Sequence, residues 1–140
     1  MRVLFDTNVV LDLLLDRGPH AASAGFVMSA SDRGLIDGLL CAISATTVFH
    51  LLGRTVGKSA AFTDLQSLLQ IFEVAAVDGP VLQAAMASDF TDFQDAVIHE
   101  AALAAGAVGI VTRDRSGFGR ATLPIYSPAE LSAIVRTISE

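Results

Sequence analysis

Short apolar segments alternate with longer, more mixed segments along the chain, and both kinds are bounded by capping or turn residues. The short segments have the composition of buried strands, and the longer ones have the length and the start and stop signals of helices. We expect Ser44 to cap the helix that follows it. Predicted strands cover residues 3–5, 38–43, 72–77, 108–111 and 124–126, and predicted helices cover 9–15, 20–32, 44–52, 59–70, 78–88, 93–105 and 128–138, with a break at 53–57 and a polar loop at 112–120.

The predicted strands are almost wholly apolar, which is typical of strands buried on both faces of a parallel sheet. Because helices alternate with them, the order predicts an α/β fold, a three-layer α/β/α sandwich with a mostly parallel sheet of four to five strands. The chain has 140 residues and no repeat or linker, so we expect a single domain over 1–140. Ligands of such sheets bind beyond the carboxyl ends of the strands, and the residues there are the candidate site.

Composition narrows the classes of function. Hydrophobic residues make up 52% of the chain and charged residues 17%, with a mean hydropathy of +0.56. These values exclude a disordered polyelectrolyte and favour a surface covered by a partner or a second copy. The lone Cys41 cannot form an internal disulfide, and Arg2, Asp6, Asp12 and Asp16 interrupt the apolar start of the chain. We therefore expect a cytoplasmic protein that does not enter the membrane.

Acidic residues stand at the predicted carboxyl edge of the sheet. Asp6 follows the first strand, Asp114 follows strand 108–111, and Asp95 lies at the start of the helix that leads into that strand. Carboxylates that converge in this way repel one another, and a divalent cation relieves part of that repulsion. Oxygen ligands suit Mg²⁺ or Mn²⁺, which stabilise a phosphodiester transition state and can supply a bound hydroxide. The pattern predicts a metal site formed by these three acids.

Each acid also has a purely structural interpretation. Asp6 could cap the helix that begins near Asn8, because Asp is a favoured N-cap. Asp95 could interact with the positive end of its helix dipole, and Asp114 could be an ordinary turn residue. The metal interpretation therefore depends on all three acids meeting at one edge of the sheet.

Several segments together resemble the PIN-domain family, which includes the VapC-like toxin ribonucleases. The opening segment 3–12 (VLFDTNVVLD) resembles the first strand and helix of that family. Segment 92–96 (DFQDA) resembles its third motif, and segment 109–114 (GIVTRD) resembles its fourth, followed by the usual Gly117-Phe118. The order and spacing of the motifs are kept over nearly the whole chain.

This resemblance implies a metal-dependent endoribonuclease, often the toxin component of a type II toxin–antitoxin system. Asp6, Asp95 and Asp114 would then be the catalytic, metal-binding acids for Mg²⁺ or Mn²⁺. Asn8 and Thr112 would orient the carboxylates or a bound water. In the implied mechanism the metal activates a water molecule that attacks an RNA phosphorus in line.

The resemblance also implies partners. They are an RNA substrate, a small antitoxin protein and, together with the high hydrophobic content, a second copy of the chain in a homodimer. We expect the antitoxin to cover the apolar helices near 9–30 and 44–70. We also expect it to insert a basic side chain towards the acids.

One departure from the family concerns a Glu that usually lies on the helix after the second strand. Alignment of segment 43–50 (ISATTVFH) puts His50 at or near this position, and no acid occurs between Asp37 and Asp64. Mg²⁺ accepts His poorly, although Mn²⁺ tolerates it. His50 is therefore a metal ligand, a donor that faces phosphate, or a structural residue, and the missing acid would weaken metal binding or abolish activity.

Two other residues near Asp95 have more than one interpretation. Asp92 precedes Asp95 by three residues, and it is either a helix cap or a fourth acid of the site. His99 lies one turn beyond Asp95, and we interpret it as a residue of the helix face rather than a ligand.

Basic residues near the predicted acids partly offset the net charge of −6. A general electrostatic binder of nucleic acid would be basic overall, so any binding here must be local. Arginine pairs well with phosphate, and these residues would form a basic rim that holds an RNA backbone. The alternative is that they are ordinary surface cations. They are Arg113, Arg115 and Arg120 in the loop at 112–120, and Arg54, Lys58 and His50 on one helix face.

Two other functions compete with the ribonuclease. A phosphatase of the haloacid-dehalogenase kind uses a nucleophilic Asp after the first strand and a second Asp two residues later, where this chain has Asn8. A non-catalytic, or catalytically weakened, PIN-like binding module would explain both the apolar composition and His50 in place of Glu.

Overall fold

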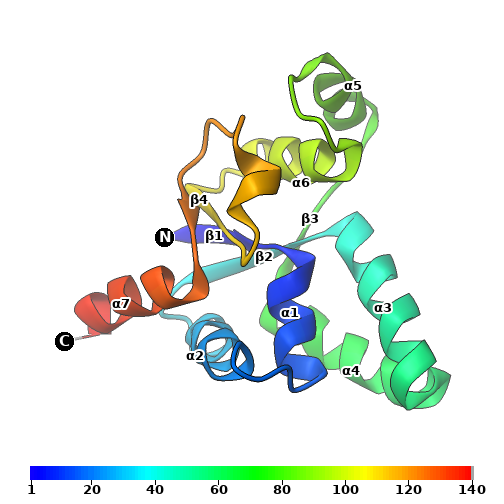
Figure 1. Ribbon diagram of the computed structural model, residues 1–140, viewed down its shortest axis with the longest axis vertical. Helices are drawn as coiled ribbons and strands as arrows, with labels where there is room; N and C mark the ends of the chain where they lie inside the picture. The colour runs from blue at the N-terminus through cyan, green and yellow to red at the C-terminus, as the bar shows by residue number, and fades with distance from the viewer. Residues whose placement is uncertain (140) are drawn as a thin grey trace.

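A parallel sheet forms the centre of the computed structural model, which describes residues 1–139 (Figure 1). Its five strands follow the order β3-β2-β1-β4-β5, and every neighbouring pair is parallel. The first strand of the chain therefore lies in the middle, between β2 and β4. The strands are β1 (Arg2–Phe5), β2 (Asp37–Cys41), β3 (Glu73–Ala75), β4 (Gly109–Val111) and β5 (Ile125–Tyr126).

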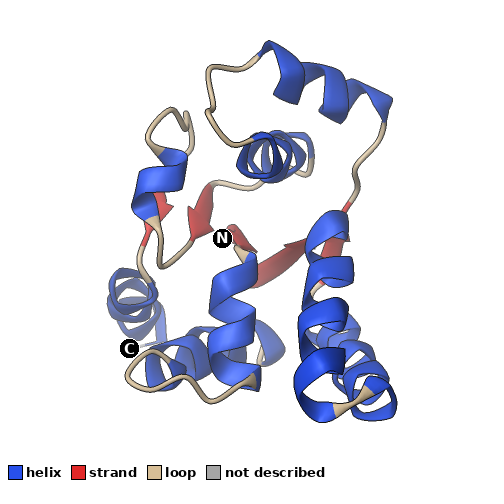
Figure 2. Ribbon diagram, turned by 45° about the vertical axis from the view of Figure 1, so that its right-hand side comes forward, coloured by secondary structure: helices blue, strands red, loops and turns tan. Residues whose placement is uncertain are grey.

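Helices cover both faces of the sheet (Figure 2). One layer consists of α1, α2, α3, α4 and α7, and the other consists of α5, α6 and the short 3-10 helix η1. The helices are α1 (Thr7–Leu14), α2 (Ala21–Asp32), α3 (Ala42–Val56), α4 (Lys58–Ile71), α5 (Gly79–Ala87), α6 (Phe93–Ala104), η1 (Arg115–Phe118) and α7 (Pro128–Ser139).

Side-chain alternation along β1 divides the core into these two layers. Val3 and Phe5 pack against the larger layer, and Leu4 between them packs against α5 and α6. All three are completely buried, and each contributes about 1.5–3 kcal/mol to the free energy of unfolding. The apolar strands predicted from the sequence thus hold the two helical layers together.

The predicted three-layer α/β/α fold is confirmed, but some element ends differ from the prediction. Strand β2 ends at Cys41, and Ser44 lies inside the first turn of α3 rather than capping it. The helix predicted over 44–52 continues to Val56, because Gly53 is tolerated inside it and the turn occurs at Gly57, whose φ is +92°. Within residues 1–139, no helix combines the length and the apolarity needed to cross a bilayer.

Candidate functional site

Asp6 stands at the carboxyl end of the central strand β1. Its backbone N–H donates to the carbonyl of Val111 at 2.9 Å, which extends the β1–β4 pairing by one residue. Its Oδ1 accepts the backbone N–H of Thr7 at 2.9 Å, so Asp6 is the N-cap of α1. The residue is only 7% exposed. Asp6 therefore fills the capping role while its carboxylate stays at the edge of the sheet.

Thr112 connects the ends of β1 and β4 through its hydroxyl group. The hydroxyl donates to Asp6 Oδ2 at 2.7 Å and accepts the backbone N–H of Asp114 at 3.0 Å. The side-chain amide of Asn8 donates to the same hydroxyl at 3.3 Å and to Asp6 Oδ2 at 3.4 Å. Thr112 is completely buried, so this network fixes the Asp6 carboxylate and the start of the following loop.

Asp95 and Asp114 come from different elements and approach the same glycine. Asp95 lies in the first turn of α6, and Asp114 directly precedes η1, where its Oδ1 accepts the hydroxyl of Ser116 at 2.6 Å. A Cβ atom placed on Gly117 would lie 2.5 Å from Asp95 Oδ2 and 3.7 Å from Asp114 Oδ2. Only a glycine leaves the Asp95 carboxylate in its present position, whereas the 3.7 Å approach to Asp114 would be an ordinary contact.

Asp92 caps α6. Its Oδ1 accepts the backbone N–H of Asp95 at 3.0 Å, and Asp92 itself is exposed. Its charge nevertheless raises the pKa of both Asp6 and Asp95, so it lies near the other acids. The structure thus gives Asp92 the capping role while keeping it at the margin of the acidic cluster.

Burial and mutual repulsion raise the pKa of two of these carboxyl groups. The pKa of Asp95 rises to about 6, first through burial and then through the charges of Asp6, Asp92 and Asp114. Burial also raises the pKa of Asp6, although the hydrogen bond from Thr112 works in the opposite direction. Both pKa values are raised because negative charge is concentrated in a buried place, and a divalent cation bound there would lower them again.

The three predicted acids, Asp6, Asp95 and Asp114, line one pocket of about 270 Å³, which we call the acid pocket. Its walls come from the start and end of α1, from α3, from α6 and from the loop after β4. The residues that line it are Asp6, Thr7, Asn8, Leu11, Arg17, Leu51, Gln94, Asp95, Ile98 and Asp114.

The donor chemistry of this pocket fits a divalent cation. Carboxylates from β1, α6 and the loop after β4 offer hard oxygen ligands, and their repulsion falls when a cation binds between them. Among residues 1–139, no group of three or more His, Cys, Asp or Glu side chains already stands at ligand spacing. Asp6, Asp95 and Asp114 are the pocket residues that would hold Mg²⁺ or Mn²⁺.

His50 lies on the exposed surface of α3 and outside the set of residues that line the pocket. The next residue, Leu51, lines the pocket instead. Gln94 of α6 lies opposite, and its side-chain amide donates to the hydroxyl of Thr47 at 3.4 Å. On this side, the pocket is therefore lined by the apolar side chain of Leu51 and the amide of Gln94, which the Thr47 hydroxyl holds.

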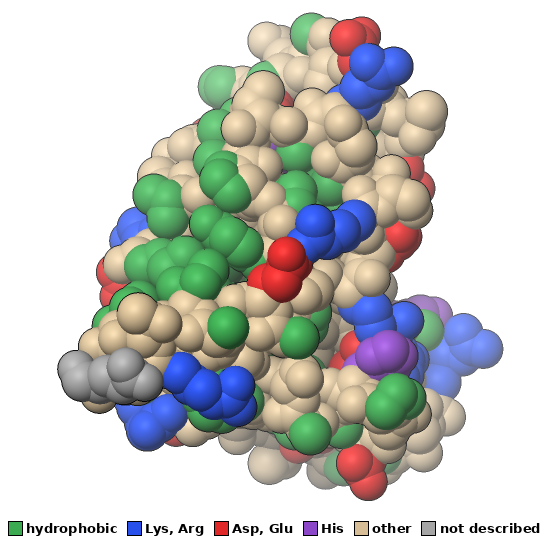
Figure 3. All heavy atoms as spheres, turned by 60° about the vertical axis from the view of Figure 1, so that its left-hand side comes forward, with side chains coloured by type: hydrophobic (Ala, Val, Ile, Leu, Met, Phe, Trp, Pro, Cys, Tyr) green, Lys and Arg blue, Asp and Glu red, His purple; other side chains and the backbone are tan. Residues whose placement is uncertain are grey.

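Two arginines of the predicted rim, Arg113 and Arg115, are already engaged in ion pairs. Arg113 donates from Nε and Nη2 to the two carboxylate oxygens of Asp12, at 2.7 and 3.1 Å. Arg115 pairs with Glu130 at the start of α7. Figure 3 shows basic and histidine side chains gathered on one part of the surface, next to acidic side chains. A basic region is present, but these two guanidinium groups are partly neutralised.

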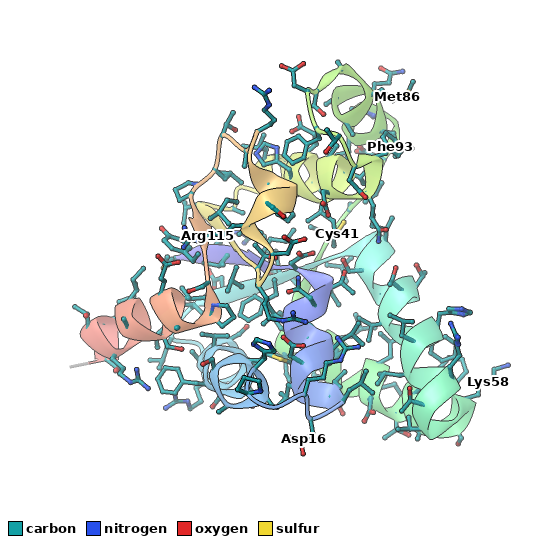
Figure 4. All side chains as sticks on the ribbon, viewed as in Figure 1. Asp16, Cys41, Lys58, Met86, Phe93 and Arg115 are labelled. Atoms are coloured by element: carbon teal, nitrogen blue, oxygen red, sulfur yellow. The ribbon has the colours of Figure 1, made fainter. Side chains whose placement is uncertain are left out.

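The other basic residues of the rim lie farther out. Arg54 and Lys58 are exposed at the turn between α3 and α4, and Figure 4 shows Lys58 at the end of this helix pair. Arg120 lines a different pocket, of about 510 Å³, between α5, α6 and the loop after η1.

His99 has a structural role away from the acids. Its Nε2 accepts the backbone N–H of Thr122 at 3.0 Å, and its Nδ1 lies 2.7 Å from Glu100 Oε2. These partners assign the proton to Nδ1. The buried ring therefore fastens the loop after η1 to α6, and His99 lies outside the set of residues that line the pocket of Asp6, Asp95 and Asp114.

Sequence reasoning missed two charged residues of this region. Asp12 is completely buried and holds Arg113, and Arg17 lines the acid pocket. A signal was available, because Asp12 is the one acid within the apolar helix 9–15, and a buried acid requires a cationic partner. Arg17 follows Asp12 by five residues and was a candidate for that partner.

Comparisons with known proteins agree with this fold. A family model described as PIN domain matches residues 2–116. No curated protein matches the sequence. Among solved structures, FitAcB of Neisseria gonorrhoeae is 21% identical with a TM-score of 0.71, over 91% of this chain and 98% of that one.

Two further structures are similar at lower identity. VapBC2 of Rickettsia felis, bound to a DNA fragment from its promoter, is 14% identical with a TM-score of 0.72, over 91% of this chain and 98% of that one. VapC20 of Mycobacterium tuberculosis, a toxin that cleaves the sarcin–ricin loop, is 16% identical with a TM-score of 0.67, over 86% of this chain and 98% of that one.

The fold and the site define a class of α/β proteins in which carboxylates gather at the carboxyl edge of a parallel sheet. Within that class, the family match over residues 2–116 covers most of the chain. The chain belongs to the PIN domain family, and the resemblance seen in its motifs is confirmed.

Proposed function

We propose that this protein is a metal-dependent endoribonuclease and the toxin of a type II toxin–antitoxin system. The observation that carries the proposal is the meeting of Asp6, Asp95 and Asp114 in one pocket of a PIN domain. These acids come from three separate stretches of the chain, and the pKa of Asp95 rises to about 6 partly because of the other charges. Capping and turn formation alone would not require them to share a pocket.

The chain's own residues position the reaction. Asp6, Asp95 and Asp114 would hold Mg²⁺ or Mn²⁺, which when bound supplies Lewis-acid activation of water and of the phosphodiester. Thr112 and Asn8 fix the Asp6 carboxylate through hydrogen bonds of 2.7 and 3.4 Å. Since α1 is capped by the same carboxylate, its orientation is also tied to the fold.

The direct test is RNA cleavage by the wild type and by Asp6→Asn, with end-labelled RNA and DNA of the same sequence in Mn²⁺ or Mg²⁺. Asn is also a good N-cap, so Asp6→Asn should keep the fold while removing a charged ligand. We expect the variant to lose RNA cleavage at an unchanged circular dichroism spectrum.

A matched control is Asp78→Asn. Asp78 caps α5 by accepting the backbone N–H of Val81 at 3.0 Å, and it does not line the acid pocket. Its variant removes one charge from a helix cap and should cleave RNA like the wild type. Equal cleavage by Asp6→Asn and Asp78→Asn would refute the proposed site.

We also propose a small antitoxin as the partner, acting in the cytoplasm with this chain. Leu13 of α1 and Val56, Phe62 and Leu69 of the α3–α4 pair are large apolar side chains between 36% and 49% exposed. FitAcB and VapBC2, which are similar in fold, are themselves complexes. Co-expression with the product of a neighbouring small gene should restore growth inhibited by this chain, and failure to do so would count against the pairing.

A homodimer remains part of the proposal. Met86 of α5 is 74% exposed and Phe93 of α6 is 53% exposed, and Figure 4 shows both at the α5–α6 end of the molecule. Light scattering after gel filtration should give twice the chain mass for the wild type and the monomer mass for Met86→Glu/Phe93→Glu. A monomeric wild type would contradict this part of the proposal.

A non-catalytic binding module is the second candidate, because alignment puts His50 at or near the position where the family usually has a Glu. It would show no cleavage and no change in melting temperature in Mn²⁺. The phosphatase alternative gains no support, since the Asn8 side chain is an amide that hydrogen-bonds to Asp6 and Thr112.

A further inference from the structure

Arg17 is the only cationic residue among those that line the acid pocket. It lies just beyond the end of α1, whose other end is capped by Asp6. The pocket thus has carboxylates on several walls and a single guanidinium group opposite them. A cation in that place is expected to interact either with the acids or with an anion that enters the pocket.

The end of α1 directs Arg17 towards this position. The N–H of Arg17 donates to the carbonyl of Asp12 at 2.9 Å, and the N–H of Asp16 donates to the carbonyl of Leu13 at 3.1 Å. This is the hydrogen-bond pattern of a Schellman motif, with Asp16 in the left-handed conformation at a φ of +50°. The backbone therefore reverses at Asp16 and brings Arg17 back over the last turn of the helix.

The Arg17 side chain retains free hydrogen-bond donors. Its Nη1 lies 3.6 Å from Asp12 Oδ1, a distance that is short enough for an ion pair but too long for a hydrogen bond. Arg113 occupies both oxygens of the same carboxylate. Within residues 1–139, the guanidinium of Arg17 makes no hydrogen bond, and the side chain is 40% exposed.

The Asp12 cluster carries a net positive charge beside the acids. One buried carboxylate faces two guanidinium groups, so one positive charge is left over. Arg113 is the better satisfied of the two, because it donates two hydrogen bonds to Asp12 while Arg17 only approaches that carboxylate to 3.6 Å. The surplus charge therefore resides on Arg17, at the wall of the pocket.

We propose that Arg17 binds a phosphate of the substrate RNA in the acid pocket, with Asp12 holding it in place. This inference rests on the proposed ribonuclease function. The two N–H groups at one edge of a guanidinium match two oxygens of a phosphodiester. Without such a cation, the carboxylates of Asp6, Asp95 and Asp114 would repel that anion. Arg17 thereby supplies attraction for the RNA backbone at a site whose own charge is negative. Arg113 and Arg115, which are already paired, are not expected to do so.

The test compares Arg17→Gln with Arg33→Gln. Arg33 also follows the end of a helix and is exposed, but it lies before β2, at the opposite edge of the sheet from the acids. Each substitution is placed in the non-cleaving Asp6→Asn background. Affinity for a fluorescein-labelled single-stranded RNA is measured by anisotropy over a series of NaCl concentrations.

Arg17→Gln should weaken RNA binding about tenfold, since a charge-assisted hydrogen bond to phosphate is lost. It should also reduce the slope of log affinity against log salt by about 0.7, the value for one phosphate contact with a single strand. Arg33→Gln should change neither quantity. Arg17→Lys, which keeps the charge without the paired N–H groups, should keep the slope and lose a few-fold in affinity.

The outcomes separate this inference from the proposed function. If Arg17→Gln binds and, with Asp6 intact, cleaves RNA as well as its parent, the phosphate role is wrong and the nuclease stands. If the wild type leaves RNA intact but Arg17→Gln still reduces binding and salt slope, the nuclease function is wrong and the phosphate site stands. Circular dichroism of each variant excludes loss of fold as the cause.

Discussion

Asp6 uses both of its carboxylate oxygens within the protein. Oδ1 caps α1 and Oδ2 accepts the hydroxyl of Thr112. Oδ2 also accepts the longer hydrogen bond from Asn8 at 3.4 Å, so the second lone pair of Oδ1 is the one that remains for a cation. Asp6 thus both caps α1 and lines the acid pocket. These two roles explain why its structural and its functional interpretation were both reasonable.

Thr112→Val tests the hydrogen bond that holds the Asp6 carboxylate. The change preserves shape but removes the hydroxyl that serves Asp6 and the N–H of Asp114. We expect a loss of about 1–3 kcal/mol in the free energy of unfolding, measured by urea denaturation. Affinity for Mn²⁺ should fall about 10–100-fold by calorimetry.

Thr112→Ser is the control, because it retains the hydroxyl. It should recover most of the Mn²⁺ affinity. Wild-type Mn²⁺ binding by Thr112→Val would show that the hydroxyl network does not orient the site.

Asp95 should make the stability of the metal-free protein depend on pH. The pKa of Asp95 is about 6 in the folded protein and 3.8 in the unfolded chain. Between these two pH values, the native protein therefore binds more protons than the unfolded chain. The associated stability is complete below about pH 4 and is lost as pH rises through 6. After allowance for solvent screening, we expect this loss to be about 1–2 kcal/mol.

Asp95→Asn provides the measurement. In EDTA, it should melt above the wild type at pH 7, and the difference should vanish near pH 4. A difference that is the same at both pH values would contradict the raised pKa of Asp95.

At the scale of elements, η1 approaches the acids closely at its glycine, Gly117. Gly117→Ala would place a methyl group 2.5 Å from Asp95 Oδ2, so the carboxylate must move. We expect Mn²⁺ affinity to fall at least tenfold by calorimetry, with little change in melting temperature, since the displaced side chain is partly exposed.

Gly119→Ala, two residues later, is the matched control. Its Cβ would meet only the Ser116 carbonyl at 3.7 Å, an ordinary contact. It should bind Mn²⁺ like the wild type. If both variants bind equally well, the close approach at Gly117 has no role in the site.

The end of α1 gives a second prediction at this scale. Asp16 is exposed, has a φ of +50°, and projects from the molecule in Figure 4. Glycine adopts this conformation without steric cost, so Asp16→Gly should stabilise the protein by about 0.5–1 kcal/mol in urea denaturation. Asp16→Val should destabilise it, and a stabilising valine would refute the argument from backbone conformation.

Elements were predictable where local signals and burial agree. The apolar run around β1 and the start of the helix predicted over 78–88 lie where the sequence indicated, to within one residue. The end of α3 was not predictable from the sequence. Gly53 is a common signal for the end of a helix, but α3 continues beyond it and ends before Gly57. The positive φ needed for a turn depends on how α3 packs against α4, which a single sequence does not show.

At the scale of the whole molecule, metal binding should be visible as stability. A ligand that binds only the native state at 100 times its Kd adds about 2.7 kcal/mol. For a chain of this size the melting temperature should rise by roughly 5–10 °C in Mn²⁺. Differential scanning fluorimetry should show this rise for the wild type and for Asp78→Asn but not for Asp6→Asn.

The order of the motifs made part of the site predictable. Asp6, Asp95 and Asp114 follow from the rule that ligands sit at the carboxyl ends of parallel strands, and all three line one pocket. Arg17 did not follow from that rule, because it reaches the pocket through the turn after a helix. Pairing of Arg113 with Asp12 likewise depends on the packing of α1 beside the loop after β4.

The central place of β1 in the sheet has a consequence for the protein during its own translation. Asp6 leaves the ribosome before Thr112 and Asp114, which are more than a hundred residues later in the sequence. A nascent chain lacks a complete pocket until β4 and η1 have emerged and paired with β1. The proposed nuclease would therefore be inert towards the messenger that encodes it and the ribosome that makes it until β4 and η1 have joined β1.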